Sequence, residues 1–177
     1  MIRLFAGIPL DPQVAERLAS LAAGIPGARW IEARNLHLTL RFIGDVDEGL
    51  AHDLHDALAD IASPVFDLTV ENFGTFGAKR PHTLWAGIVR EPALERLRDK
   101  IESVAVRAGL PPEPRKFMPH VTLARLEDSP VGRIQEFIAR NSPFRAGPTP
   151  VANFTLFRSY LSRSGAEYEL VAEYPLR

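Results

Sequence analysis

The stretch His37-Leu38-Thr39-Leu40 returns 83 residues later as His120-Val121-Thr122-Leu123. Three further pairs of segments match in the same order at offsets of 80 or 81: 4–8 with 84–88, 11–12 with 91–92, and 70–73 with 151–154. One such match could arise by chance, but four in one order and at an almost constant offset indicate an internal repeat. The chain is therefore predicted to contain two similar halves, approximately 1–76 and 82–160, followed by a closing C-terminal strand.

Each half is predicted to run strand, helix, strand, helix, strand. Leu50, Leu54 and Leu58 recur at helical spacing, whereas Phe66, Leu68 and Val70 alternate with polar residues as in a half-buried strand. Predicted strands cover 3–8, 36–43, 65–73, 83–89, 119–126, 151–161 and 167–174. Predicted helices cover 12–25, 48–62, 92–108 and a short stretch after 129–130, with loops at 109–114 and 143–150 where proline and glycine gather.

This pattern predicts an α+β fold in a single bilobal domain spanning residues 1–177. The two lobes would be related by a pseudo-twofold axis, each an antiparallel-rich sheet with helices outside. The active-site cleft is expected between the two sheets, because a cleft between lobes is a common place for a ligand.

Bulk composition excludes several classes of protein. The chain has 177 residues, a formal net charge of −1 and no cysteine, so disulfides, thiolate metal sites and cysteine nucleophiles are ruled out. A protein that coats long nucleic acid usually carries a clear basic excess, so a nucleic-acid substrate would be held only by a short end. The N-terminal apolar stretch is too short for a signal peptide. We expect a cytoplasmic monomer that does not bind membranes.

The two His-x-Thr strands carry the chemistry. Side chains alternate along a strand, so His37 and Thr39 share one face while Leu38 and Leu40 take the other. The repeat brings His120 and Thr122 to the same cleft. Displacement at phosphorus needs a base for the attacking oxygen and an acid for the departing oxygen, and histidine serves either role near neutral pH. The threonine hydroxyls could hold the non-bridging oxygens.

The two motifs make the sequence resemble a known family. A repeat with one His-x-Thr-x motif per half is similar to the 2H phosphoesterase superfamily. Within it, segments 3–8, 37–44 and 119–125 resemble the bacterial and archaeal RNA 2′,3′-cyclic phosphodiesterases, also called 2′-5′ RNA ligase-like proteins. The resemblance covers essentially the whole chain. It implies hydrolysis of a terminal 2′,3′-cyclic phosphate to a 2′-phosphate with no metal and no cofactor, and in some members a weak, reversible 2′-5′ ligation of RNA.

The resemblance also assigns roles to individual residues. It makes His37 the proton donor to the departing 3′ oxygen and His120 the acceptor that activates water. It makes Thr39 and Thr122 ligands of the phosphate, and it adds Arg125 as a basic substrate-binding residue. Strand alternation, however, places Arg125 on the opposite face from Thr122 unless the strand bulges.

Other candidates have a functional and a plain structural interpretation. Phe5 and Trp85 occupy equivalent repeat positions and could stack a nucleobase, although packing beneath the site is favoured. Arg41 shares the parity of His37 and could face the cleft, or it could be a surface residue. A solvated position is favoured for the remaining polar candidates, which are Arg115, Lys116, His52, His55 and His82. The spacing of His52 and His55 would suit a metal ion, but no third ligand is evident in the sequence.

Two alternatives to the leading hypothesis remain open. The same site could act on another phosphodiester, such as ADP-ribose cyclic phosphate, 2′-5′ oligoadenylate or an RNA tail. The chain could instead be a non-catalytic RNA- or nucleotide-binding module, which loss of a motif histidine or threonine would favour; all four are intact.

Overall fold

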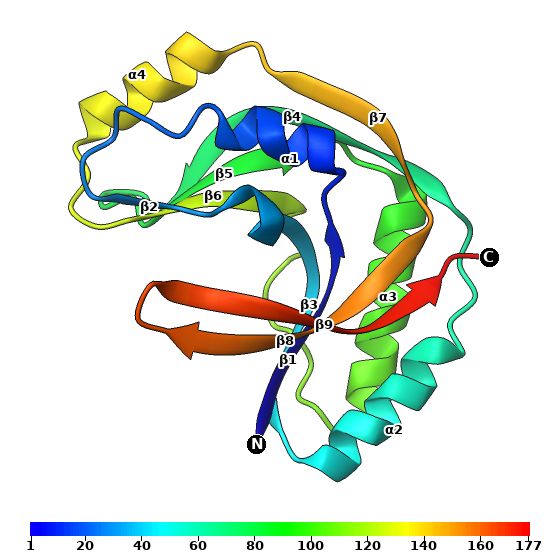
Figure 1. Cartoon of the computed structure of the whole chain (residues 1–177). Helices are drawn as coiled ribbons and strands as arrows, with labels where there is room; N and C mark the ends of the chain where they lie inside the picture. The colour runs from blue at the N-terminus through cyan, green and yellow to red at the C-terminus, as the bar shows by residue number, and fades with distance from the viewer.

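The computed structural model describes all residues from Met1 to Arg177. Four α-helices, a short 3₁₀ turn and nine strands follow one another along the chain (Figure 1). The strands are β1 (Ile2–Pro9), β2 (Ala28–Trp30), β3 (His37–Val46), β4 (Phe66–Phe76), β5 (Thr83–Ile88), β6 (His120–Leu126), β7 (Arg145–Val151), β8 (Asn153–Ser162) and β9 (Gly165–Pro175). The helices are α1 (Pro12–Ala19), α2 (Glu48–Ala59), α3 (Pro92–Arg107) and α4 (Val131–Asn141), and the 3₁₀ turn is Ala33–Asn35.

Local sequence explains where the helices begin and end. The Asp11 carboxylate accepts from the first backbone amides of α1, and Pro12 occupies the first turn, where its missing N–H costs nothing. The predicted helix over 12–25 ends earlier, at Ala19. Gly24 follows with a φ of 84°, a left-handed conformation that a right-handed helix cannot contain. Ile25 is still buried, so its apolar character reflects the core and not a continued helix.

The strands form one curled antiparallel sheet in the order β7-β4-β5-β6-β3-β1-β8-β9, and β2 pairs with the end of β6. In Figure 1, α1 and α4 lie beside β4 and β7, whereas α2 and α3 lie beside β3 and β9. Only one residue pair, Leu38 with Val121, bridges β3 and β6 and so links the two halves of the sheet. The predicted α+β class, with helices outside antiparallel strands, is confirmed.

The third strand of each sequence repeat leaves its own half. β4, from the first half of the chain, pairs with β5 from the second half, and β8, from the second half, pairs with β1 from the first. Each half of the sheet is thus assembled from both halves of the sequence.

The stretch 143–150 was expected to be a loop, and this prediction is wrong. Residues 145–151 form β7, which pairs with β4 at one edge of the sheet. An edge strand pairs on one side only, so it tolerates Pro148 and Pro150, which have no backbone N–H to donate. The proline content that indicated a loop therefore marked an edge strand.

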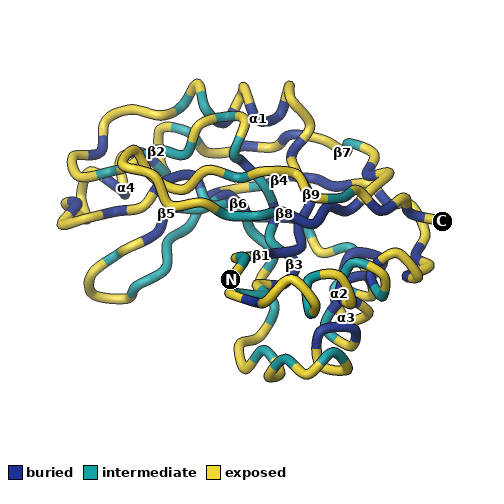
Figure 2. The backbone as a smooth tube through the Cα atoms, turned by 60° about the horizontal axis from the view of Figure 1, so that its bottom comes forward, coloured by how far each residue is buried: buried dark blue, intermediate teal, exposed yellow.

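Forty buried residues form one apolar cluster beneath the sheet and the helices. The predicted inward positions of α3 belong to it, with Leu94 and Leu97 fully buried. Figure 2 shows the buried positions running through the central strands, while the loops and the outer turns of the helices are exposed. The catalytic candidates lie on the sheet face opposite this cluster.

Candidate active site

The two His-x-Thr segments are neighbours at the junction of the sheet halves. Leu38 and Val121, which form the single bridge between β3 and β6, are fully buried in the core. His37, Thr39, His120 and Thr122 are half-buried and alternate with them, so they project from the other face. The two histidines directly precede the paired residues Leu38 and Val121, so they lie close together, and the charge of His120 lowers the pKa of His37. The structure thus brings together all four residues that the motif predicts.

Each histidine is held by the same backbone contact. His37 Nδ1 lies 2.8 Å from the carbonyl oxygen of Asn35, and His120 Nδ1 lies 2.7 Å from that of Met118. A carbonyl can only accept, so Nδ1 must carry the proton in both rings. Nε2 is then the atom that can gain or lose a proton. Each Nδ1 is fixed by the carbonyl two residues earlier, so in both rings Nε2 is the nitrogen left free of the backbone, on the sheet face opposite the core.

Burial lowers the pKa of both histidines below 6.5. The hydrogen bonds to Asn35 and Met118 oppose this effect only in part, and the guanidinium of Arg125 adds to it. His37 is more deeply buried than His120, and the charge of His120 lowers the pKa of His37 further. In the free protein both rings are therefore held towards the neutral form.

Aromatic rings enclose each imidazole. The His37 ring centroid is 4.8 Å from that of Phe5 and 5.0 Å from that of Tyr168, which meets it edge-on. His120 meets Phe76 edge-on at 4.9 Å, with Trp85 at 6.4 Å. Phe5 is 1% exposed, so it packs beneath the site and cannot stack a base, as the structural interpretation predicted.

The threonine beside His37 already engages the reactive nitrogen. Thr39 Oγ1 lies 3.0 Å from His37 Nε2. Its hydroxyl can donate to Nε2 when the ring is neutral and accept from it when the ring is protonated. Thr122 occupies the equivalent place beside His120 and is also half-buried.

A bulge in each motif strand decides where the two arginines point. Leu40 on β3 and Leu123 on β6 have no partner in the register with β1 and β5. The next residue in each strand, Arg41 or Ala124, is buried as well, so alternation is reset. The bulge turns Arg125 to the sheet face of the histidines, where its charge lowers the pKa of both. The same device turns Arg41 away, and the prediction that it shares the face of His37 is wrong.

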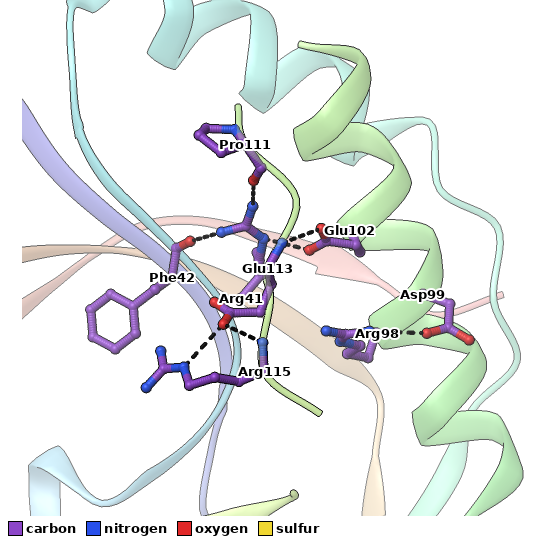
Figure 3. Close-up of polar contacts among 8 residues, drawn as sticks. All are labelled: Arg41, Phe42, Arg98, Asp99, Glu102, Pro111, Glu113 and Arg115. Carbon is purple, nitrogen blue, oxygen red and sulfur yellow. Dashed lines mark hydrogen bonds and ion pairs between the residues drawn. The ribbon is translucent and has the colours of Figure 1, made fainter. Parts of the chain in front are cut away.

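Arg41 is instead the centre of a buried polar network (Figure 3). Its side chain is 8% exposed and forms an ion pair with Glu102 of α3. Its guanidinium also donates to the carbonyl oxygens of Phe42 and Pro111, the latter at 2.6 Å. Glu102 in turn accepts from the Glu113 amide at 2.9 Å. Arg41 therefore ties the strand of His37 to the segment that leads to Met118, whose carbonyl holds His120.

The remaining candidates lie away from the two motif histidines or at the border of the motif strands. His52 faces Asp56 at 3.5 Å on exposed helix surface, and His55 is hydrogen-bonded to the Tyr174 hydroxyl at 2.9 Å. Nowhere do three His, Cys, Asp or Glu side chains gather as a metal site would require. Exposed Lys116 and Arg115 are on the loop before β6, and Arg115 pairs with Glu113.

His82 is exposed and reaches the Arg125 guanidinium only through Thr83, whose hydroxyl lies 2.9 Å from His82 Nδ1 and 3.2 Å from Arg125 Nη1. A surface cavity of about 240 Å³ between β1 and β7 contains none of the motif side chains. None of the helices has the length and apolar composition that crossing a bilayer requires.

Sequence reasoning missed two residues of the site. Tyr168 comes from β9, the last strand, and Phe76 comes from the end of β4. Phe76 could have been found, because it is the repeat equivalent of Phe157 at the offset of 81, and Phe157 also packs near His37. Tyr168 has no equivalent in the other half, so no repeat signal marks it.

Comparisons of sequence and of structure with known proteins point to one family of phosphoesterases. The profile of the LigT-like phosphoesterases matches residues 8–85 and 87–168. An RNA 2′,3′-cyclic phosphodiesterase of Aeropyrum pernix is 32% identical over 85% of this chain and 86% of that protein. One of Escherichia coli is 31% identical over 94% and 92%. The crystal structure of E. coli LigT in its apo form superposes with a TM-score of 0.81 at 29% identity, covering 99% of this chain and 97% of that one. With matches along nearly its whole length, this chain belongs to the LigT-like phosphoesterase family.

Proposed function

We propose that this protein hydrolyses the 2′,3′-cyclic phosphate of RNA ends or nucleotides to a 2′-phosphate by two-histidine acid–base catalysis without a metal. The observation that carries the proposal is the pair of imidazoles on one face of the sheet, each with Nδ1 fixed on a backbone carbonyl and Nε2 left to exchange a proton. The activity named for the relatives, RNA 2′,3′-cyclic phosphodiesterase, supports the substrate class.

The reaction is an in-line displacement at phosphorus. His120 Nε2 takes a proton from water as the water oxygen bonds to phosphorus. The P–O3′ bond breaks on the opposite side, and His37 Nε2–H gives its proton to O3′. The products are a 2′-phosphate and a 3′-hydroxyl, and each histidine ends in the other's starting state. A 5′-hydroxyl in place of water would form a 2′-5′ phosphodiester by the same steps.

Three polar side chains would hold the phosphate between the rings. Thr39 and Thr122 stand one on each side and can donate to the non-bridging oxygens, and Arg125 supplies a positive charge. The substrate anion also favours the protonated state of His37, whose pKa burial lowers in the free protein. Binding therefore prepares the acid, because the anion raises that pKa when it enters the cleft.

The test is hydrolysis of the four nucleoside 2′,3′-cyclic phosphates, with chromatographic assignment of the product isomer. Wild-type protein should release 2′-phosphates, and neither EDTA nor added Mg²⁺ should change the rate. His37→Ala and His120→Ala should each lose activity by at least about 100-fold, the usual contribution of a general acid or base. His52→Ala, which alters an exposed histidine of α2, is the matched control and should keep the wild-type rate.

Each result also discriminates against an alternative. A 3′-phosphate product would reverse the assignment of the departing oxygen. Near wild-type rates in either motif variant would refute the two-histidine mechanism. Binding of the cyclic nucleotides without turnover would favour the non-catalytic module.

A further inference from the structure

A buried threonine holds the guanidinium of Arg125. Thr83 of β5 lies directly opposite Arg125 of β6 in the register of the sheet. The Thr83 hydroxyl oxygen accepts a hydrogen bond from Arg125 Nη1 at 3.2 Å. The guanidinium makes no other hydrogen bond to the protein and no ion pair with a carboxylate. A neutral group therefore fixes the charge of Arg125 and leaves that charge available to an anion.

The charge of Arg125 acts on groups from both sides of the site. Burial lowers the pKa of His37 and of His120, and the Arg125 charge lowers each of them further. Burial raises the pKa of the Tyr168 hydroxyl, and the same charge opposes that rise. His120 belongs to β6 and Tyr168 to β9, so one guanidinium acts on groups from both halves of the sheet.

The Thr83 hydroxyl is oriented by a third side chain. His82 Nδ1 lies 2.9 Å from Thr83 Oγ1. A guanidinium can only donate, so Thr83 Oγ1 accepts from Arg125 and can give its own hydrogen to His82 Nδ1. The backbone of His82 is held in turn, because its amide donates to the Phe76 carbonyl and its carbonyl accepts from the Leu126 amide, both at 2.9 Å. The three side chains form a chain of hydrogen bonds that ends on the guanidinium.

Packing does not explain a hydroxyl at position 83. Thr83 is 2% exposed, and valine, which has the same shape, is equally suited to a buried strand position. Both partners of the hydroxyl, His82 and Arg125, are exposed, so water could replace it for each of them. A buried hydroxyl that gains no more than water would provide is a cost to the fold. The hydroxyl is therefore explained by its effect on Arg125.

The pair belongs to one half of the sequence only. The repeat offset of 80 puts Arg3 at the position of Thr83, and the offset of 83 puts Phe42 at that of Arg125. The first half thus has neither member of the pair. Hydroxyl and guanidinium occur together on the His120 side and are both absent on the His37 side, as expected if one serves the other.

We infer that Thr83 is a positioning residue for Arg125: its hydroxyl, oriented by His82, holds the guanidinium where the substrate phosphate binds. The inference rests on the proposed function and deepens it, because it states how the arginine of the site is held. A long arginine side chain loses rotamer freedom when it binds an anion, and fixing it beforehand reduces that cost. The bond made by Nη1 leaves the other N–H groups of the guanidinium to the phosphate.

The test removes the hydroxyl with and without Arg125 present. Thr83→Val and Thr83→Ser are made in the wild-type protein, Thr83→Val is also made in Arg125→Ala, and hydrolysis of adenosine 2′,3′-cyclic phosphate is measured. Thr83→Val should lower kcat/KM by about 3- to 10-fold, the effect of losing one hydrogen bond. Thr83→Ser, which keeps the hydroxyl, should restore most of the rate. In Arg125→Ala, the same valine should change the rate by less than about twofold, because the group it positions is gone.

His82→Ala tests the outer end of the chain of hydrogen bonds. It should lower kcat/KM less than Thr83→Val does, and it should add nothing in the Thr83→Val protein, because it acts through the hydroxyl. A loss that persists in Thr83→Val would overturn the orienting role of His82. Because His82 is exposed, this variant also keeps the test open if Thr83→Val fails to fold: its loss must then disappear in Arg125→Ala.

A second measurement does not depend on turnover. The ring signals of His37 and His120 are followed by NMR as the pH is varied, and then as inorganic phosphate is added. In Arg125→Ala both pKa values should rise, because a charge that lowers them is gone, and phosphate should bind more weakly. Thr83→Val should shift both pKa values and the phosphate affinity in the same directions, by smaller amounts.

Thr149→Val is the matched control, because it also removes a threonine hydroxyl with a 3.2 Å hydrogen bond, on an edge strand. It should match wild type in both measurements. An equal loss of rate with and without Arg125, or wild-type behaviour of Thr83→Val in both measurements, would overturn the inference. Failure of the proposed function looks different, because wild-type protein would then turn over no cyclic phosphate, and the NMR titrations would still decide whether Thr83 holds Arg125.

Discussion

Removing the charge of Arg41 should destabilise the fold far more than removing that of an ordinary surface arginine. In Arg41→Met, the Glu102 carboxylate keeps only the Glu113 amide, and the Phe42 and Pro111 carbonyls lose their donor. The side chains of Arg41 and Glu102 are 8% and 18% exposed, so water screens little of this. Breaking a buried ion pair by deleting one partner costs about 3–5 kcal/mol. For a chain of this length, that lowers Tm by about 6–20 °C.

The assay is urea unfolding followed by circular dichroism, with thermal melts as a second measure. Arg34→Met is the matched control, because Arg34 pairs with Glu32 on open surface at 70% and 68% exposure, where an ion pair contributes at most about 1 kcal/mol. The double variant Arg41→Met/Glu102→Leu removes both charges and should be less destabilised than the sum of its single variants. Equal costs for Arg41→Met and Arg34→Met would refute the buried network as a source of stability.

Three further outcomes follow from the site. The pH optimum of kcat/KM should lie below 6.5, because burial lowers the pKa of both histidines in the free protein. In the pH profile of kcat, the descending limb, where His37 loses its proton, should move to higher pH because the bound anion stabilises that proton. An optimum above pH 7.5 in both profiles would contradict this reasoning. Thr39→Val should lower kcat/KM by about 10- to 100-fold through loss of a hydrogen bond to a charged group, whereas Thr149→Val, which removes a hydroxyl bonded to a carbonyl on the edge of the sheet, should match wild type. Gly74→Ala should lower activity, because the added Cβ would lie 2.3 Å from the Trp85 side chain, which is beside His120. Gly132→Ala on α4 should keep the wild-type rate, because a Cβ there meets nothing within 4 Å. Equal rates in the two variants would remove Trp85 from the site.

The repeat and the strand alternation were sufficient to predict most of the site. The identical spacing of His37-x-Thr39 and His120-x-Thr122 located the two strands, and alternation then gave the correct faces up to Thr39 and Thr122. Alternation failed at Arg41 because a bulge at Leu40 adds one residue to the strand. Nothing in a single sequence distinguishes a bulged leucine from a regular one, since both bury the same side chain. The equivalent bulge at Leu123 is what brings Arg125 to the cleft.

Other differences come from pairing between distant segments. The stretch 145–151 was predicted as a loop because Pro148 and Pro150 cannot donate in a sheet interior, and only its place at the edge beside β4 reconciles them with a strand. Tyr168 reaches His37 because β9 folds back along β8, which is itself paired with β1. Such contacts depend on strand order, and a repeat seen along the chain does not reveal that β4 and β8 have changed places.

The exchange of β4 and β8 also determines when the protein can first work during its synthesis. The ribosome delivers His37 early, but β1 lacks its β8 neighbour until residue 162 is made, and the edge-on contact of Tyr168 comes later still. The second half does not have to wait in this way, because the partner of β5 is β4, which is synthesised before it. A nascent chain stopped after the first repeat therefore holds one motif on an incomplete sheet, with an open strand edge that another copy could occupy. The His37 side of the site is therefore complete only when the last hairpin has formed.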